Sequence, residues 1–506
     1  MTPLPSTPRA WLAMLSLLSF GLCATTAWTA LGGIAHVQDE QAYLFQARLY
    51  AAGMAWAPAP IDGGLVAGEF QQLSPQWFGV FPPGWPLVLA LGAGLGLPWL
   101  VNPLLAATLP WLTWAAFARK LRRQEALAAS AVAALSPGVL ALGASMMSHT
   151  LVLVCGLAAV AAITAGRAGL AGAAVGMVMV ARPLDGLVLG GPLLVWAALS
   201  LRDLRLVVGP AVAMALLLAS NQLYAGSPLT FAVEQYFAKG TDWGVTWREG
   251  CNRLGFGADR GCMGRYAKTG YTLAMGMESL SANARFFDRL LIGIPGGAVL
   301  AAVGAVLALR RRVLPLAVVV AALAGPLAYG LYWYHGVAYG ARFWHGLYLL
   351  ALPALGVVLG WRPRLGVVVL IAGVAFTFPK VWRELADDYW CVPTGLDDAL
   401  VSAGVTEGVV LMDAEGKATR RWPLTKNNRF DCEAWYPAGA GLGQNRPDGS
   451  GRLFLRAPGS ASLVHPGNEA PAINATLAEV EANHPGTPIS KATMVWGEGW
   501  RVERGE

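Results

Sequence analysis

Two adjacent carboxylates near the start of the chain are the first residues whose type and position could do chemistry. Asp39 and Glu40 lie in the stretch HVQDEQAYLFQARLYAAG, residues 36–53, directly after the first long apolar segment. A positioned carboxylate can act as a general base. Because adjacent side chains on a helix point about 100° apart, the two are not expected to share one proton, and only one should be the base. The plainer alternative is a helix cap, since an aspartate at a helix N-terminus accepts backbone N–H groups and favours the helix dipole.

The composition places these carboxylates in a membrane protein. Of the 506 residues, 55% are hydrophobic and 13% are charged, whereas a soluble globular protein carries about 25% charged residues. A membrane span needs about 20 apolar residues, and we predict about eleven spans between residues 10 and 380. The clearest stretches are 10–33, 99–118, 126–144, 148–166, 204–222, 287–309, 313–334, 344–361 and 365–379. Residues 169–201 are long enough for two short helices broken at Arg182-Pro183, because proline disfavours helix in the residue before it.

Basic residues predict the orientation, because lysine and arginine near span ends stay on the cytoplasmic side. They cluster at every second loop, at 119–123, 167, 202 and 205, 310–312, and 362 and 364. The loops that remain therefore face outward, in the cytoplasmic (inner) membrane: the stretch after His36, residues 224–285, the turn at 335–343 and everything after Lys380. Cytoplasmic arginines near anionic lipid account for much of the net charge of +7, so no nucleic-acid partner is expected.

The cysteines agree with this orientation. Cys23 and Cys155 fall within predicted spans, whereas Cys251 with Cys262 and Cys391 with Cys432 fall in the segments assigned to the outside. An oxidising outer compartment allows a disulfide in each of those two segments, and histidines at ligand spacing are lacking there. The first span could be a cleaved signal peptide, but its apolar run is long and lacks a clean small-residue cleavage site, so we predict a helix.

The composition divides the chain into two domains. Residues 1–380 form the transmembrane domain, with outer loops at 34–98 and 224–285. Residues 381–506 are more polar, and the stretches EGVVLMD and GRLFLRA indicate strands, while AINATLAEVEANHPG indicates a helix. We therefore expect a small extracytoplasmic α/β domain. The loop at 224–285 is too long for an ordinary turn and could be a lid or a plug that stabilises the helix bundle.

An apolar platform shares the first outer loop with the carboxylates. Residues 77–96, WFGVFPPGWPLVLALGAGLG, contain too few apolar residues for a comfortable span and suggest a helix lying at the membrane surface. A water-side loop would not need such a platform, whereas a site that receives a lipid-borne substrate would.

The loop also resembles a known family. The order Asp39-Glu40, Ala42-Tyr43, Ala47-Arg48, Gly53 and Pro82-Pro83-Gly84-Trp85 resembles the first outer loop of the GT-C glycosyltransferases, in particular those related to protein O-mannosyltransferases and to the lipid A aminoarabinose transferase. Five further stretches look like landmarks of bacterial membrane glycosyltransferases of that superfamily: WLVNPLLAA, MMSHTL, ARPLDGL, NRLGFG and HGVAYGARFWHGLYLLALP.

This resemblance implies a GT-C-like helical fold and a glycosyltransferase. Its donor would be a sugar on a polyprenyl-phosphate carrier at the outer face, and its acceptor a hydroxyl group of a protein, lipid A, teichoic acid or another glycan. In such enzymes the Asp of the pair is the expected base, which corresponds to Asp39. Glu40 would orient the acceptor or hold the neighbours of Asp39. Because phosphate is a stable leaving group, the site needs one base and cations for the departing phosphate, but no general acid.

The phosphate-binding residues depart from the family pattern. Relatives usually place a lysine before the PP motif, where this chain has Phe81. Arg182 and Arg342 are the expected replacements, because a guanidinium binds phosphate in a bidentate manner and an arginine near the membrane suggests function. The alternative for Arg182 is a structural salt bridge with Asp185 or snorkelling to the interface.

The histidines add weaker signals. His335 and Tyr339 form a polar cluster with Arg342 that could bind substrate hydroxyls or phosphate. His36, three residues before Asp39, could contribute to substrate binding or join Asp39 and Glu40 around a divalent metal ion, although three ligands from one short stretch are a poor metal signal. We therefore predict no metal ligands and no certain cofactor. His149 is equally consistent with a buried core histidine.

Two other classes of protein stay open at this point. A flippase or transporter of lipid-linked sugars would be expected to show charged residues deep within spans, or broken helices in two related halves. The sequence has no such internal symmetry. A non-catalytic scaffold that binds the lipid carrier is the third reading, and the Asp39-Glu40 pair argues against it.

Overall fold

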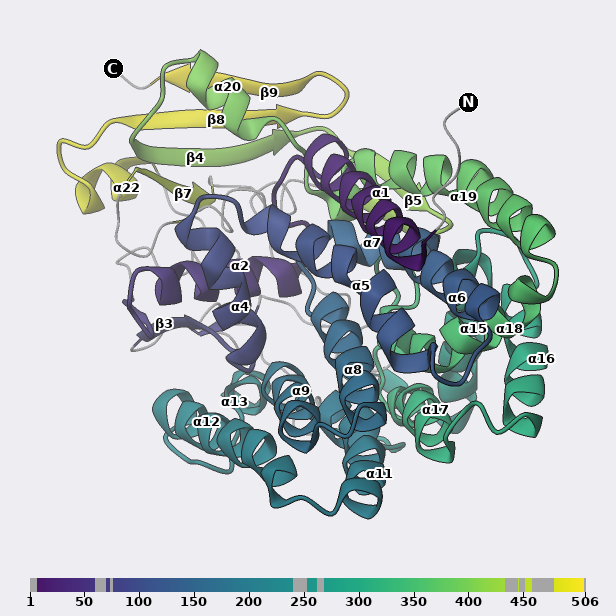
Figure 1. Cartoon of the computed structure of the whole chain (residues 1–506). Coiled ribbons are helices and arrows are strands. Elements are labelled where there is room, and N and C mark those ends of the chain that lie inside the picture. Colours follow the sequence, from purple (N-terminus) through teal and green to yellow (C-terminus); the bar gives the residue numbers. More distant parts are fainter. Residues whose placement is uncertain are drawn as a thin grey trace.

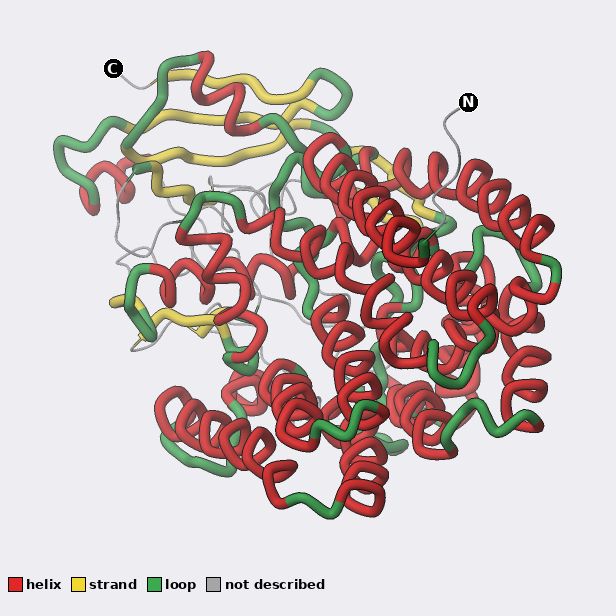
Figure 2. The backbone as a smooth tube through the Cα atoms, viewed as in Figure 1, coloured by secondary structure: helices red, strands yellow, loops and turns green. Residues whose placement is uncertain are grey.

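The computed structural model describes residues 7–59, 70–72, 76–239, 253–261, 268–432, 445, 451–456 and 477–504. A bundle of helices makes up most of the molecule, and a small sheet built from the C-terminal part of the chain lies at one end of it (Figures 1 and 2). The site described below lies where these two parts meet.

Six helical segments are long and apolar enough to cross a membrane, or seven if a bent pair counts as one span. The six are α1 (Pro8–Thr29), η1 with α5 (Pro98–Phe117), α10 to α11 (Pro183–Leu201), η3 with α12 (Leu204–Ala225), η4 with α18 (Arg342–Trp361), and α19 (Pro363–Ala386) with η5 (Tyr389–Cys391). The pair is α6 (Arg123–Leu135) and α7 (Pro137–Ala144), bent by 45°. The chain is therefore an integral membrane protein.

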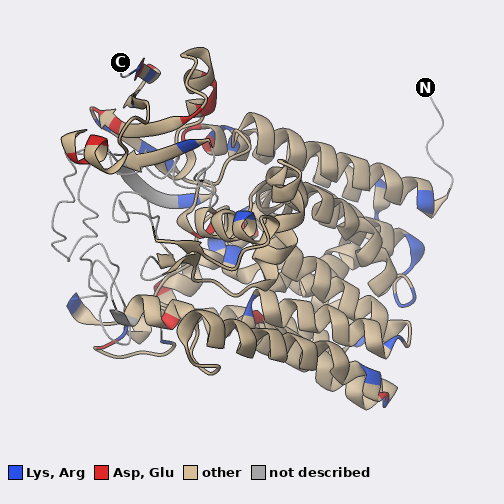
Figure 3. Ribbon diagram, turned by 90° about the vertical axis from the view of Figure 1, so that its left-hand side faces the viewer, with Lys and Arg blue, Asp and Glu red and all other residues tan. Residues whose placement is uncertain are grey.

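Five shorter apolar helices complete this part: α4 (Gly84–Gly94), α8 (His149–Thr164), α9 (Ala168–Ala181), α16 (Gly297–Arg310) and α17 (Leu316–Gly330). By length and composition the structure has six or seven candidate spans, fewer than the eleven predicted from the sequence. The count of eleven stays a prediction. The outward faces are apolar, as contact with lipid requires: Leu17, Leu199 and Phe376 are 72%, 73% and 72% exposed. Lysines and arginines gather on loops at the end of the bundle away from the C-terminal sheet (Figure 3).

Two breaks between helices bear on the sequence predictions. The break at Arg182-Pro183 is confirmed: α9 ends at Ala181, Arg182 is extended, and α10 (Pro183–Asp185) begins at the proline. A π turn (Gly186–Gly190) then leads into α11 (Gly191–Leu201). The single span expected over 287–309 is wrong. There α15 (Leu273–Leu291) stops before two glycines, Gly293 and Gly296, whose φ values are +76° and +91°, and α16 starts afresh at Gly297.

The segment between α1 and α4 holds a short helix and a three-stranded sheet. Helix α2 (Gln38–Ala51) carries the carboxylate pair. The strands are β1 (Ala57–Pro58), β2 (Gln71–Gln72) and β3 (Gln76–Gly79), in the order β1-β3-β2. From the segment after α12, α13 (Ala232–Lys239) packs Tyr236 and Phe237 against Phe70, with ring centroids 5.7 and 6.1 Å apart. Cys251 and Cys262 lie outside the described residues.

The C-terminal part contains a mixed four-stranded sheet in the order β7-β4-β8-β9. Strand β4 (Gly408–Glu415) runs parallel to β7 (Arg452–Arg456) and β8 (Ile489–Val495), and β9 (Gly499–Arg504) runs antiparallel to β8. These strands include the two that the sequence indicated. The helices are α20 (Leu396–Ser402) and α22 (Leu477–Asn483), the latter within the predicted helical stretch. The division at residue 380 stays a prediction, because α19 continues past it to Ala386.

A separate hairpin connects this region to the helix bundle. It consists of β5 (Ala418–Trp422) and β6 (Lys426–Cys432), paired antiparallel. The predicted disulfide between Cys391 and Cys432 is present and ties the end of β6 to η5, at the end of the last membrane helix. Cys23 and Cys155 are free and buried. The hairpin is thus fixed to the bundle by a covalent bond.

Candidate active site

Glu40 holds the beginning of α2 in place. Its carboxylate accepts the backbone N–H groups of His36 at 3.0 Å and Val37 at 2.9 Å, and that of Met146 at 2.7 Å. It also accepts the hydroxyl of Tyr339 at 2.8 Å. Glu40 is 1% exposed, and burial raises its pKa while these hydrogen bonds lower it. With both oxygens occupied by the protein, Glu40 holds the neighbours of Asp39 and is not free to orient an acceptor.

Tyr339 belongs to the same structural network. Its hydroxyl donates to Glu40, and its backbone N–H donates to the Tyr389 hydroxyl at 2.7 Å. The structure shows its hydroxyl donating to Glu40, and the expected role of Tyr339 in binding substrate hydroxyls or phosphate stays a prediction. Its φ of 54°, unusual outside glycine, is held by these two contacts.

His36 is also a structural residue. Its Nδ1 lies 2.8 Å from the carbonyl oxygen of Tyr389, and its Nε2 lies 2.9 Å from the carbonyl oxygen of Leu31. Both ring nitrogens are taken and the residue is 1% exposed. The expected role of His36 in binding substrate or a metal ion stays a prediction. The imidazole links the start of α2 to the end of the last membrane helix.

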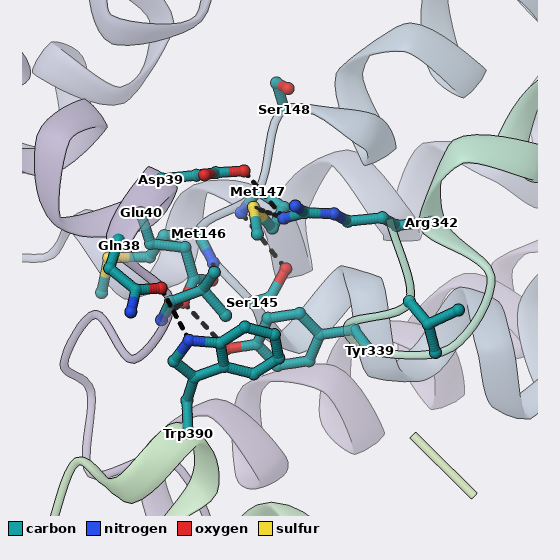
Figure 4. A network of polar contacts seen from close by, with 12 residues as sticks. Gln38, Asp39, Glu40, Ser145, Met146, Met147, Ser148, Tyr339, Arg342 and Trp390 are labelled. Atoms are coloured by element: carbon teal, nitrogen blue, oxygen red, sulfur yellow. Dashed lines mark hydrogen bonds and ion pairs between the residues drawn. The ribbon is translucent and has the colours of Figure 1, made fainter. Parts of the chain in front are cut away.

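Asp39 projects from the first turn of α2 into the site, where it meets Arg342 (Figure 4). Its Oδ2 forms an ion pair with Nη1 of Arg342 at 2.8 Å. The Asp39 side chain is 19% exposed and that of Arg342 is 3% exposed. The second carboxylate oxygen, Oδ1, has no hydrogen bond to any residue that the structure describes. One oxygen is thus anchored by a cation while the other can accept a proton.

Arg342 is held on several sides but keeps one donor unused. It begins η4 (Arg342–Leu347), and its Nη1 also contacts Sδ of Met147 at 3.6 Å. Its guanidinium carbon lies 5.2 Å from the ring centre of Phe343 and 5.7 Å from that of Tyr334. The buried Nε has no hydrogen-bond partner. Because a buried donor without a partner is costly, this N–H is well suited to receive an anionic ligand.

Arg182 lies at the helix break and contacts three side chains. It pairs with Asp185, as the alternative reading of the sequence allowed, and its Nη2 donates to the Tyr329 hydroxyl at 2.7 Å and its Nη1 to Ser148 Oγ at 3.3 Å. The Tyr329 hydroxyl in turn donates to Asp185 at 3.2 Å. The Arg182 side chain is 14% exposed despite the salt bridge, so part of its guanidinium remains accessible.

The two arginines lie near the same aromatic ring. The ring of Phe343 lies 5.8 Å from the Arg182 guanidinium and 5.2 Å from that of Arg342. Tyr43 of α2 is close enough to both arginines and to Asp39 for all three charges to act on its hydroxyl, whose pKa burial raises. The structure therefore brings together Asp39, Arg182 and Arg342, three of the seven residues expected from the sequence.

Phe81 and the other polar residues form the surroundings. Phe81 lies against Tyr43, with ring centroids 4.8 Å apart, and supplies an apolar wall beside α2. His335 stacks on Tyr334, with ring centroids 5.0 Å apart, and its Nδ1 accepts the N–H of Val337 at 3.0 Å. The role of His335 stays a prediction.

The sequence analysis assigned no role to several residues around Arg182 and Arg342. Ser148 and Tyr329 bind Arg182, and the buried rings of His149 and His345 lie 6.2 Å apart with no hydrogen-bond partner for any of their four nitrogens. The signals for three of them were the MMSHTL stretch, which contains Ser148 and His149, and the HGVAYGARFWHGLYLLALP stretch, which contains His345. Within the described part of the chain, no group of three or more His, Cys, Asp or Glu residues could hold a metal ion.

Comparison with known proteins gives structural similarities but no match in sequence. No protein-family model matches the sequence, and no curated protein matches it. The fold is similar to the crystal structure of an oligosaccharyltransferase from Archaeoglobus fulgidus, solved in complex with Zn and sulfate, with a TM-score of 0.42 and 13% sequence identity. The match covers 78% of this chain and 54% of the archaeal chain, so this chain spans about half the length of that protein.

Proposed function

We propose that this chain is a membrane glycosyltransferase that transfers a sugar from a polyprenyl-phosphate carrier to an acceptor hydroxyl on the extracytoplasmic face. The observation that carries the proposal is the gathering of one partly exposed carboxylate, Asp39, with two guanidinium groups, Arg182 and Arg342, beside membrane helices. A base and a cationic pair are what sugar transfer from a phosphate leaving group needs.

Asp39, Arg182 and Arg342 have different tasks in the proposed reaction. The acceptor oxygen forms a bond to the anomeric carbon while its proton passes to Oδ1 of Asp39. The bond between that carbon and the phosphate oxygen breaks, and the phosphate leaves with the electron pair. Arg342, through its unpartnered Nε–H, and Arg182 stabilise the departing phosphate. The ion pair to Oδ2 fixes the direction of the carboxylate throughout.

Two observations support the assignment of the site to the outer face. Lysines and arginines lie on loops at the end of the bundle away from the C-terminal sheet, as expected of cytoplasmic loops (Figure 3). The disulfide between Cys391 and Cys432 lies in the C-terminal part, and such bonds persist in oxidising compartments. The site, next to the disulfide-bonded segment, would then face outward.

The test compares the lipids that co-purify with wild-type protein and with Asp39→Asn, identified by mass spectrometry. The variant keeps the shape of the side chain but loses the base. We expect the glycosylated polyprenyl phosphate to accumulate on the variant and the free polyprenyl phosphate on the wild type, which would also identify the sugar. If neither preparation carries a polyprenyl lipid, the proposal is wrong, and a transporter or scaffold becomes the better reading.

A further inference from the structure

A short non-helical segment, residues 145–148, joins α7 to α8 and lies against the start of α2 (Figure 4). All of its residues are buried, and none is more than 3% exposed. The backbone N–H of Met146 donates to Oε1 of Glu40 at 2.7 Å. Because Glu40 follows Asp39 in the first turn of α2, this bond connects the segment to the helix that carries the proposed base.

The next two residues of this segment contact the two arginines of the site. Sδ of Met147 lies 3.6 Å from Nη1 of Arg342. Oγ of Ser148 accepts a hydrogen bond from Nη1 of Arg182 at 3.3 Å. Three consecutive residues are thus in contact with α2, with the first arginine and with the second. A shift of the segment would therefore move the proposed base and both cationic groups relative to one another.

Side chains from other helices bind the carbonyl groups of this segment. Backbone that is not helical lacks helical hydrogen bonds, and leaving its polar groups unpaired in apolar surroundings is costly. Nδ2 of Asn102 donates to the carbonyl oxygens of Ser145 at 2.6 Å and Met147 at 2.8 Å. Nε1 of Trp85, on α4, donates to the carbonyl oxygen of Met146 at 2.8 Å. Three consecutive carbonyl groups therefore each have a side-chain donor.

Asn102 supplies two of these three hydrogen bonds with one amide group. It is the second residue of α5 (Val101–Phe117) and is 1% exposed. An asparagine amide has two N–H donors, and here both are used on carbonyl oxygens of the same segment. Its Oδ1 has no hydrogen-bond partner in the part of the chain that the structure describes. The two donors are therefore what this buried side chain contributes.

We propose that Asn102 is a positioning residue of the active site. By binding two carbonyl groups of residues 145–148, it holds this segment in the shape that places the base and the two phosphate-binding arginines together. Asn102 does not touch the substrate and acts through the segment. This inference rests on the function proposed above, because the groups that it places are the proposed base and the cations for the phosphate.

The test measures how strongly the protein in nanodiscs prefers undecaprenyl phosphate over undecaprenol, its uncharged counterpart. Both lipids have the same hydrocarbon chain, so the ratio of their dissociation constants depends on how the site holds the phosphate. A side chain that only stabilises the fold would not change this ratio in folded protein. Asn102→Leu keeps the approximate size of the side chain and removes both donors.

Leu109→Ala is the matched control for a loss of stability in the same helix. Leu109 lies about two turns after Asn102 on α5 and is fully buried, so its truncation leaves a cavity without removing a bond to residues 145–148. Thermal unfolding measures the stability of each variant. Asn102→Ser is a milder change that keeps one donor, and it decides the question if Asn102→Leu does not fold.

We expect Asn102→Leu to reduce the preference for the phosphate about tenfold or more, while undecaprenol binding stays at the wild-type level. Asn102→Ser should show a smaller reduction. Leu109→Ala should unfold at a lower temperature than wild type and keep the wild-type preference.

If wild-type protein prefers the phosphate and the folded Asn102 variants keep that preference in full, the positioning role is refuted and the proposed function stands. An equal reduction in Leu109→Ala would refute the role as well, since any loss of stability would then have the same effect. If the wild type itself shows no preference for the phosphate, the proposed function fails and the role of Asn102 fails with it.

Discussion

Replacing Arg342 by lysine should separate the two tasks of this residue. The guanidinium uses Nη1 to hold Asp39 at 2.8 Å and has its Nε–H available for phosphate. A lysine ammonium is a single point charge on a flexible stem. In Arg342→Lys it can stay paired with Asp39, but it cannot present a second, rigidly placed donor to the phosphate. The variant should therefore keep the ion pair and lose a phosphate contact.

The magnitude follows from the contact that is lost. One hydrogen bond between a charged donor and a charged acceptor contributes about 1.5–3 kcal/mol, which corresponds to about 10- to 150-fold in the dissociation constant. Arg342→Gln, by contrast, leaves the Asp39 carboxylate without its partner. Breaking a buried ion pair in this way costs about 3–5 kcal/mol of stability, so Arg342→Gln should also unfold more readily than Arg342→Lys.

The assay is equilibrium binding of undecaprenyl phosphate to purified wild type and variant, with undecaprenol as the uncharged reference. Arg205→Lys serves as the matched control, because the Arg205 side chain is 82% exposed and pairs only at the surface with Asp203. The reasoning is refuted if Arg342→Lys binds undecaprenyl phosphate as tightly as wild type does. It is equally refuted if binding of undecaprenol falls by the same factor, since the loss would then not concern the phosphate.

A further prediction concerns stability. In Gly84→Ala the new Cβ would lie 2.6 Å from the backbone nitrogen of Ala181, next to Arg182, so we expect thermal unfolding to show a loss of about 1–3 kcal/mol. Gly94→Ala in the same helix meets its nearest atom at 3.7 Å and should be neutral; equal behaviour of the two would contradict the close packing.

Local sequence patterns predicted the features that depend on neighbouring residues. Proline restricts the residue before it, so the break at Arg182-Pro183 could be predicted and is present. The position of Asp39 in the first turn of a helix follows from the same kind of local rule. The break before Gly297 was missed because the stretch around it is apolar throughout, and hydropathy alone does not register two glycines with positive φ.

The roles of the site residues depend on contacts that no local pattern contains. Glu40 is bound by Met146 and Tyr339, which are 106 and 299 residues away in the sequence. His36 is bound by Tyr389, at a separation of 353 residues. Residue types told us which side chains could be catalytic. Only the fold shows that Glu40, His36 and Tyr339 make hydrogen bonds that hold the start of the helix that carries Asp39.

The contact between η5 and the start of α2 also has a consequence for biosynthesis. His36 and Tyr389 are 353 residues apart in the sequence, so a ribosome makes the two partners of this hydrogen bond at widely separated times. The bond between Cys391 and Cys432 forms only where thiols are oxidised. Fixing η5 and the hairpin beside α2 is therefore a late assembly event that is tied to the redox state of the compartment.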